Sequence, residues 1–177
     1  APLLDRGFAV SPDGVTWTRL DIPKIPSSDE GNFSLDSQRG LFIHTVKRGG
    51  KYGRAVALAT STDFETWDDL GLVFQSDAED QERGKTKIAI RKADSTLQQN
   101  FQDDPQVYNV DVYNMGVFRY EDLYIGLPAM YHAVGSIPNY PNTDGFHLIQ
   151  LVCSRDLRTW QRLGDRQTFI GPSRIDS

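Results

Sequence analysis

The chain is poor in cysteine and histidine. Its 177 residues contain one cysteine, Cys153, and three histidines. A single cysteine excludes an internal disulfide, and these few side chains lack the spacing of zinc ligands. We therefore expect no metal and no other cofactor. Cys153 follows the apolar run 148–152 and is interpreted as a small buried hydrophobe rather than a nucleophile.

The sequence also lacks an excess of basic residues and any long apolar run. It has 19 Lys and Arg residues against 24 Asp and Glu residues, a net charge of −5. Without a basic patch, nucleic acid is not an expected partner. Without an apolar run long enough to span a bilayer, a membrane is not an expected partner either. No signal peptide opens the chain, whose first residues have the character of a trimmed or internal start.

What the chain does contain is a repeat that includes every tryptophan. The pattern S-x-D-x-x-T-W-x-x-L occurs at 11–20, 61–70 and 154–163. We interpret each copy as a tight turn whose Ser and Asp side chains bond to the backbone, followed by a strand. Three copies predict an array of β-sheet blades with equivalent, largely buried tryptophans that pack between neighbouring sheets. These are Trp17, Trp67 and Trp160.

A second correspondence lies upstream of the turn motif. Residues 32–46 align with residues 114–128 at an offset of 82, and both segments read as strand, polar turn, strand. A hairpin of different length, 47–53 or 133–145, leads to a third strand, the turn motif and a fourth strand. This order predicts four-stranded antiparallel meanders of the kind that form β-propeller blades. A β-sandwich built from repeated hairpins is the alternative.

The predicted fold class is therefore all-β, with about two to two and a half propeller blades, where a closed ring typically needs roughly four to eight. So few blades do not close a ring, and the open edge is expected to be covered by further blades or by another chain. The expected parts are a blade tail at 6–20, a blade at 29–75, a charged connection at 76–106 and a second blade at 107–169.

The connection is expected to be partly ordered, because structureless loops of that length are unusual. Within it, residues 85–92 are predicted as a strand and residues 95–100 as a short helical turn. The charged residues 77–83 are interpreted as a solvated face.

Two segments, 41–67 (LFIHTVKRGGKYGRAVALATSTDFETW) and 111–132 (DVYNMGVFRYEDLYIGLPAMYH), resemble the five-bladed propellers of glycoside hydrolase families 43 and 32 and their relatives. The S-x-D-x-x-T-W turn is similar to the S-x-D turns of those families and is one residue shorter than the sialidase turn. The resemblance covers most of the chain. It implies a carbohydrate substrate, hydrolysis of glycosidic bonds by carboxylates on the innermost strands of different blades, and an extracellular or periplasmic location.

The catalytic motifs of those families (W-x-N-D-P-N, R-D-P and E-C) do not occur in this chain, so the repeat supplies the candidates. Asp29 and Asp111 are related by the offset of 82 and precede Asn32 and Asn114 by three residues. They are the candidate catalytic residues, expected to face one space and to oppose each other's ionisation. The alternative, that both are turn residues at strand entries, stays open.

Polar and aromatic side chains near these carboxylates suit the ring and hydroxyls of a sugar. Arg54 is interpreted either as the partner of a carboxylate in the central funnel of the propeller or as a solvated residue at the end of a strand. The candidate substrate-binding residues are Glu30, Arg54, Tyr113, Asn114, Tyr131 and His132. The leading functional hypothesis is a glycosidase-like hydrolase. A non-catalytic propeller that binds a glycan or a protein is the alternative, and a purely structural propeller piece is a third possibility.

Overall fold

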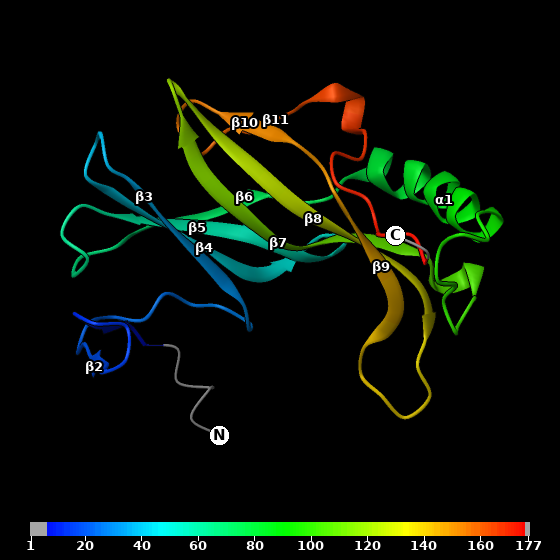
Figure 1. Cartoon of the computed structure of the whole chain (residues 1–177), viewed down its shortest axis with the longest axis horizontal. Coiled ribbons are helices and arrows are strands. Elements are labelled where there is room, and N and C mark those ends of the chain that lie inside the picture. Colours follow the sequence, from blue (N-terminus) through cyan, green and yellow to red (C-terminus); the bar gives the residue numbers. More distant parts are fainter. Residues whose placement is uncertain (1–6, 176–177) are drawn as a thin grey trace.

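The computed structural model describes residues 7–175, which form three antiparallel sheets and one α-helix (Figure 1). The all-β class is confirmed. Strands β1 (Ala9–Val10) and β2 (Thr18–Arg19) pair as a short ribbon. Four consecutive strands form the next sheet, called sheet I here, in the order β3-β4-β5-β6. They are β3 (Gly31–Asp36), β4 (Leu41–Gly50), β5 (Gly53–Ser61) and β6 (Asp68–Phe74).

The remaining strands form a second meander, called sheet II. They are β7 (Asn109–Tyr120), β8 (Leu123–Ser136), β9 (Thr143–Ile149), β10 (Val152–Ser154) and β11 (Gln161–Arg162). Both β9 and β10 pair with β8, so they are one strand interrupted at residues 150–151. Short 3₁₀ turns, Pro105–Val107 and Gly164–Arg166, flank the sheet. Over the described residues, the two meanders do not close a ring.

Sheet I lies between sheet II and the N-terminal segment. One face of sheet I packs on sheet II around Ile43, Leu58, Met115 and Val152, all nearly fully buried. Its other face packs, through Val46, Ala57 and Ala59, against Phe8 and Ile25 of the N-terminal segment. Most of the apolar area removed from water is therefore shared between neighbouring layers rather than enclosed within one sheet.

The S-x-D turns form as predicted. Ser61 Oγ accepts a hydrogen bond from the Phe64 N–H, and Asp63 Oδ1 accepts from the next two backbone N–H groups at 2.8 and 2.7 Å. The copies that begin at Ser11 and Ser154 repeat these bonds. Backbone N–H donors at the turn lower the pKa of Asp63 to about 2. The Ser and Asp side chains thus close each turn locally, which is why the motif is readable from sequence.

The tryptophans are only partly equivalent. Trp67 and Trp160 are half-buried, and each indole N–H donates to the backbone carbonyl three residues earlier. Trp67 also stacks on Phe8 with ring centroids 5.1 Å apart. Trp17 is 62% exposed, so the prediction of burial is wrong for the first copy. Its ribbon has two residues in each strand, too few to build a sheet around the indole.

The connection contains a helix, α1 (Ala78–Ala93), where residues 85–92 were predicted as a strand. Asp77 and Asp80 form a capping box, each side chain accepting from the other residue's backbone N–H at 3.0 Å. Acidic residues in the first turn and basic residues in the last complement the helix dipole. Residues 95–100 form a turn followed by irregular chain rather than a helical turn. None of the described helices is long and apolar enough to cross a membrane.

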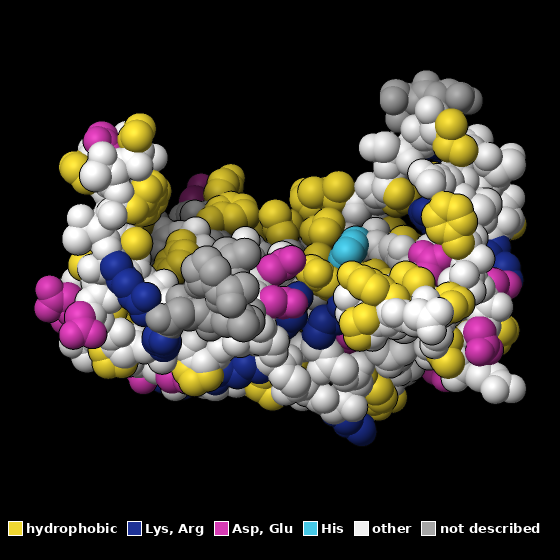
Figure 2. All heavy atoms as spheres, turned by 90° about the horizontal axis from the view of Figure 1, so that it is seen from below, with side chains coloured by type: hydrophobic (Ala, Val, Ile, Leu, Met, Phe, Trp, Pro, Cys, Tyr) yellow, Lys and Arg dark blue, Asp and Glu magenta, His cyan; other side chains and the backbone are white. Residues whose placement is uncertain are grey.

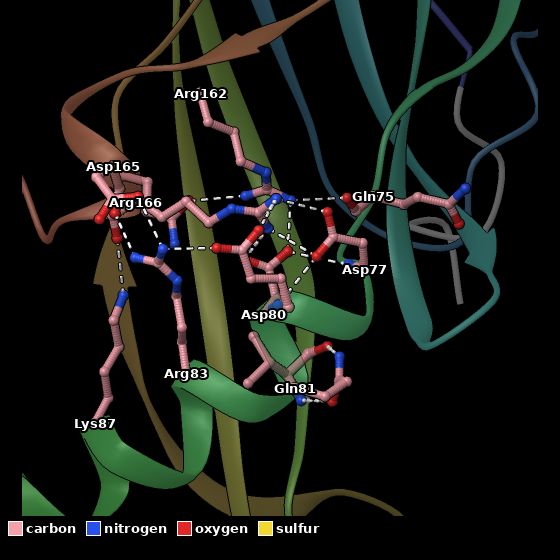
Figure 3. A network of polar contacts seen from close by, with 12 residues as sticks. Gln75, Asp77, Asp80, Gln81, Arg83, Lys87, Arg162, Asp165 and Arg166 are labelled. Atoms are coloured by element: carbon pink, nitrogen blue, oxygen red, sulfur yellow. Dashed lines mark hydrogen bonds and ion pairs between the residues drawn. The ribbon is translucent and has the colours of Figure 1, made fainter.

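A network of ion pairs joins the start of α1 to β11 and to the 3₁₀ turn that follows it (Figure 3). Asp80, 3% exposed, lies 2.5 Å from Arg162 Nη2 and 3.0 Å from Arg166 Nη1. Arg166 also makes a two-bond contact with Asp77 at 2.7 and 2.8 Å. The charges match one another within this network, so the residues interpreted as a solvated face serve instead to dock the helix.

Candidate functional site

Asp111 lies near the start of β7, beneath the turn that joins β4 to β5. Its side chain is 7% exposed, and Oδ2 accepts hydrogen bonds from the Arg54 backbone N–H at 3.2 Å and from Arg54 Nε at 2.8 Å. Gly53 permits this approach, because a Cβ there would lie 2.8 Å from Oδ2. Asp111 Oδ1 is buried without a hydrogen-bond partner among residues 7–175. Arg54 therefore balances the charge of Asp111 and leaves one carboxylate oxygen as an acceptor.

The ring of Tyr113 lies against two cations from sheet I. Lys47 Nζ is 3.5 Å from the ring centroid, and the Arg54 guanidinium carbon is 4.8 Å from it. Arg54 also lies 4.5 Å from the ring centroid of Tyr131. Such distances fall within the range of cation–π contacts. Sheet I thus reaches the first and second strands of sheet II through charged side chains that pack on aromatic rings.

Asp29 and Glu30 approach the same rings just before β3. Lys47, whose side chain is 2% exposed, lies 2.6 Å from Asp29 Oδ1, while the Asp29 side chain is 55% exposed. Asn114 Nδ2 donates to Glu30 Oε2 at 3.0 Å. The two carboxylates therefore differ in setting, since Asp29 has a cation and Glu30 has a neutral amide.

All the predicted site residues except His132 meet in this cluster. Figure 2 shows acidic, basic and histidine side chains close to one another near the middle of one face of the molecule. The residues brought together are Asp29, Glu30, Arg54, Asp111, Tyr113, Asn114 and Tyr131. We call this set, with Lys47, the β7 cluster.

The two carboxylates do not occupy equivalent positions, although the offset of 82 predicted that they would. The second strands of the sheets open at Leu41 and Leu123, whose partners across the hairpins are Asp36 and Tyr120. The hairpin turn has four residues in sheet I and two in sheet II, so the first strands are related by an offset of 84. Asp29 therefore reaches the cluster from the segment before β3, whereas Asp111 reaches it from within β7.

His132 lies on the opposite face of sheet II from the cluster. Tyr131 pairs with Asp111 across β7 and β8, and neighbouring residues of a strand point to opposite faces. The imidazole of His132 is 1% exposed and stacks on Phe146 with ring centroids 5.0 Å apart. Burial there lowers the pKa of His132 to about 4. Its assignment as a substrate-binding residue is therefore wrong.

His147 and Lys47 belong to the cluster and were not identified from the sequence. The His147 ring centroid lies 4.9 Å from that of Tyr113 and 5.0 Å from that of Tyr131. Burial lowers the pKa of His147, and the Arg54 cation lowers it further, against the opposing effect of Asp111. Strand alternation is the signal for His147, because it pairs with Tyr131 and shares its face.

The cluster combines three carboxylates, two cations and three aromatic rings on one side of β7. Aromatic rings beside charged groups are side-chain types that can contact a polar ligand with hydroxyl groups. Within residues 7–175, no group of three or more His, Cys, Asp or Glu side chains is arranged to hold a metal ion. Comparisons with protein-family models and with curated proteins found no match for this sequence.

Proposed function

We propose that this protein acts on carbohydrate and hydrolyses glycosidic bonds with paired carboxylates. The observation that supports this most is that Tyr113 contacts the cations of two candidate acids. Lys47, which contacts the ring of Tyr113, forms an ion pair with Asp29. Arg54, which contacts the same ring, forms an ion pair with Asp111. Glycosidic cleavage needs two carboxyl groups within reach of one bond.

The settings of the carboxyl groups suggest how the roles are divided. One group must carry negative charge, and the other must give a proton to the leaving oxygen. Asp111 faces the Arg54 guanidinium, which favours the charged role. Asp29 is paired with Lys47 as well, whereas the exposed Glu30 bonds to the neutral amide of Asn114, and Glu30 is therefore our candidate for the group that gives the proton.

A second candidate is a non-catalytic module that binds a glycan. The observation that favours it is that Asp29 and Asp111 each have a cation within ion-pair distance. Carboxylates neutralised in this way can serve to orient Tyr113 without taking part in a reaction. The choice between the candidates therefore depends on turnover rather than on affinity.

Turnover on a panel of soluble polysaccharides and aryl glycosides tests the proposal. We expect the wild-type chain to release new reducing ends, and Glu30→Gln to lower that rate about tenfold or more because the amide cannot give a proton. Glu65→Gln, at an exposed position of an S-x-D turn, is the matched control and should retain the wild-type rate. Binding without release of reducing ends favours the second candidate, and the absence of both binding and release contradicts the two together.

We also propose that a further sheet of the same repeat covers the outer face of sheet II. Asp36 of sheet I is buried against sheet II, whereas Tyr120, at the equivalent position of sheet II, is 62% exposed. Phe118 on the same face is 43% exposed. Sheet II covers the equivalent face of sheet I. We therefore expect the partner of this exposed face to be another meander, from this protein or from a second chain.

Light scattering of the 177-residue chain tests this partner. We expect the chain to associate as its concentration rises, because exposed aromatic residues on a sheet face promote contact between molecules. Phe118→Asp should reduce the association, whereas Phe101→Asp, at an 88% exposed loop position away from that face, should not. A chain that stays monomeric at all concentrations would count against the proposed cover.

A further inference from the structure

The third strands of the two sheets place Arg54 and His147 at equivalent positions. Arg54 pairs with Gly49 across β4 and β5, and His147 pairs with Tyr131 across β8 and β9. Gly49 and Tyr131 are related by the same offset of 82 that relates the second strands. The same position therefore carries a guanidinium in sheet I and an imidazole in sheet II.

The two side chains are used differently. Arg54 is committed to Asp111, through its side chain and its backbone N–H. For His147, neither ring nitrogen has a hydrogen-bond partner among residues 7–175, and the side chain is partly open to solvent. Its ring is nevertheless placed by Tyr113 at an interplanar angle of 88° and by Tyr131 at 53°. An imidazole held by two rings, with both nitrogens open, is arranged to bond to something outside the chain.

The charges that face His147 come from both sheets. Arg54 of β5 and Lys47 of β4 disfavour the imidazolium, whereas Asp111 of β7 and Glu30, which precedes β3, favour it. Tyr131 lies beside His147, and burial is the main cause that raises the pKa of Tyr131. The Tyr131 hydroxyl therefore stays neutral. Partial burial of the His147 ring and the two cations together lower the pKa of His147, and it is therefore neutral at pH 7.

We propose that His147 is a ligand-contacting residue of the β7 cluster that hydrogen-bonds sugar hydroxyls through its unprotonated ring. A neutral imidazole has one donor and one acceptor nitrogen, which matches the donor and acceptor capacity of a hydroxyl group. Protonation removes the acceptor and adds a third positive charge next to Lys47 and Arg54. This inference rests on the proposed carbohydrate function and names a residue through which that ligand is held.

Binding measurements at several pH values test the inference, with the same soluble polysaccharides and methyl glycosides as probes. For a probe that the wild-type chain binds at pH 7, we expect His147→Ala to weaken affinity about threefold to tenfold, the worth of one hydrogen bond. Wild-type affinity should fall between pH 7 and pH 5, and His147→Gln should lose that pH dependence. Tyr140→Gln, which removes a ring that is 58% exposed in the β8–β9 loop, is the matched control and should bind as the wild type does.

The outcomes separate the residue from the function. Equal affinity of His147→Ala and wild type for a bound probe overturns the role of His147 and leaves the carbohydrate function intact. A wild-type chain that binds no probe overturns both. Nitrogen NMR of the ligand-free protein adds a measurement that needs no probe. We expect His147 to titrate below pH 6.5, and titration above that value, or a ring N–H protected from exchange, would contradict the inference.

Discussion

Asp36→Asn is expected to lower the free energy of unfolding by about 3–5 kcal/mol, the cost of removing one partner of a buried ion pair. The Asp36 side chain has no exposed surface, and Oδ2 accepts from the Tyr124 hydroxyl at 2.8 Å and from Arg119 Nη1 at 3.3 Å. Both partners belong to sheet II, so this carboxylate joins the two sheets. An Asn side chain keeps the shape but leaves the mostly buried Arg119 with the exposed Asp122 in place of a buried counter-charge.

The effect of this substitution should depend on pH. Burial raises the pKa of Asp36, but hydrogen bonds from Tyr124 and from the Arg39 N–H, together with the Arg119 cation, outweigh it and bring the pKa below 3.8. A carboxyl group with a depressed pKa adds stability above its unfolded-state pKa and loses that contribution as pH falls through its folded-state pKa. The difference between wild type and Asp36→Asn should therefore be full near pH 7 and shrink below about pH 4.

Urea unfolding of Asp36→Asn and Asp122→Asn at several pH values provides the measurement. Asp122 is a matched control because it pairs with the same Arg119, at 3.5 Å, while its side chain is 94% exposed. Exposed pairs contribute under about 1 kcal/mol, so Asp122→Asn should unfold near the wild-type midpoint. Equal losses from the two substitutions would show that burial of Asp36 adds nothing to the contact between the sheets.

The features that could be predicted from the sequence are those that short-range bonds determine. The S-x-D turns form because Ser and Asp bond to N–H groups only two or three residues away. The strands of sheet I follow the expected order for the same reason, since short turns connect consecutive strands. The helix was missed although its signal is also local. The capping box of Asp77 and Asp80 was present in the sequence, but the run of charges was interpreted as a solvated face.

The site was predicted less accurately, because it depends on register and on which face a side chain takes. A hairpin turn shorter by two residues changes the equivalence of first strands, and a bulge between Val112 and Met115 shifts it again. His132 and His147 show the consequence. Tyr131 and His132 are adjacent in β8 and point to opposite faces of the sheet, so an error of one position moves a side chain away from the cluster. The histidine on the face of Tyr131 is its cross-strand partner His147, not His132. Lys47 carries no pattern that separates it from other strand lysines until its burial is seen.

Asp111→Asn is expected to lower turnover about 10²- to 10⁴-fold on any glycan that the wild-type chain hydrolyses, the usual range for loss of a general acid or base. The substitution keeps the volume of the side chain and removes its charge. In this protein it also leaves Arg54 over Tyr113 and Tyr131 without its carboxylate. The chemical role and the placement of the rings are therefore lost together, which places the expected loss above that of an exposed carboxylate.

The rate is compared at a temperature and urea concentration where both proteins remain folded, because removal of a partner from a buried pair also costs about 3–5 kcal/mol of stability. Asp122→Asn, in the turn between β7 and β8, is the control and should keep the wild-type rate. Arg54→Lys keeps a positive charge and the backbone N–H bond to Asp111 but loses the planar fork, so it should retain more activity than Asp111→Asn. Undiminished turnover in a folded Asp111→Asn would leave Asp111 as a structural partner of Arg54, because a group that exchanges a proton with substrate cannot be replaced by an amide without loss.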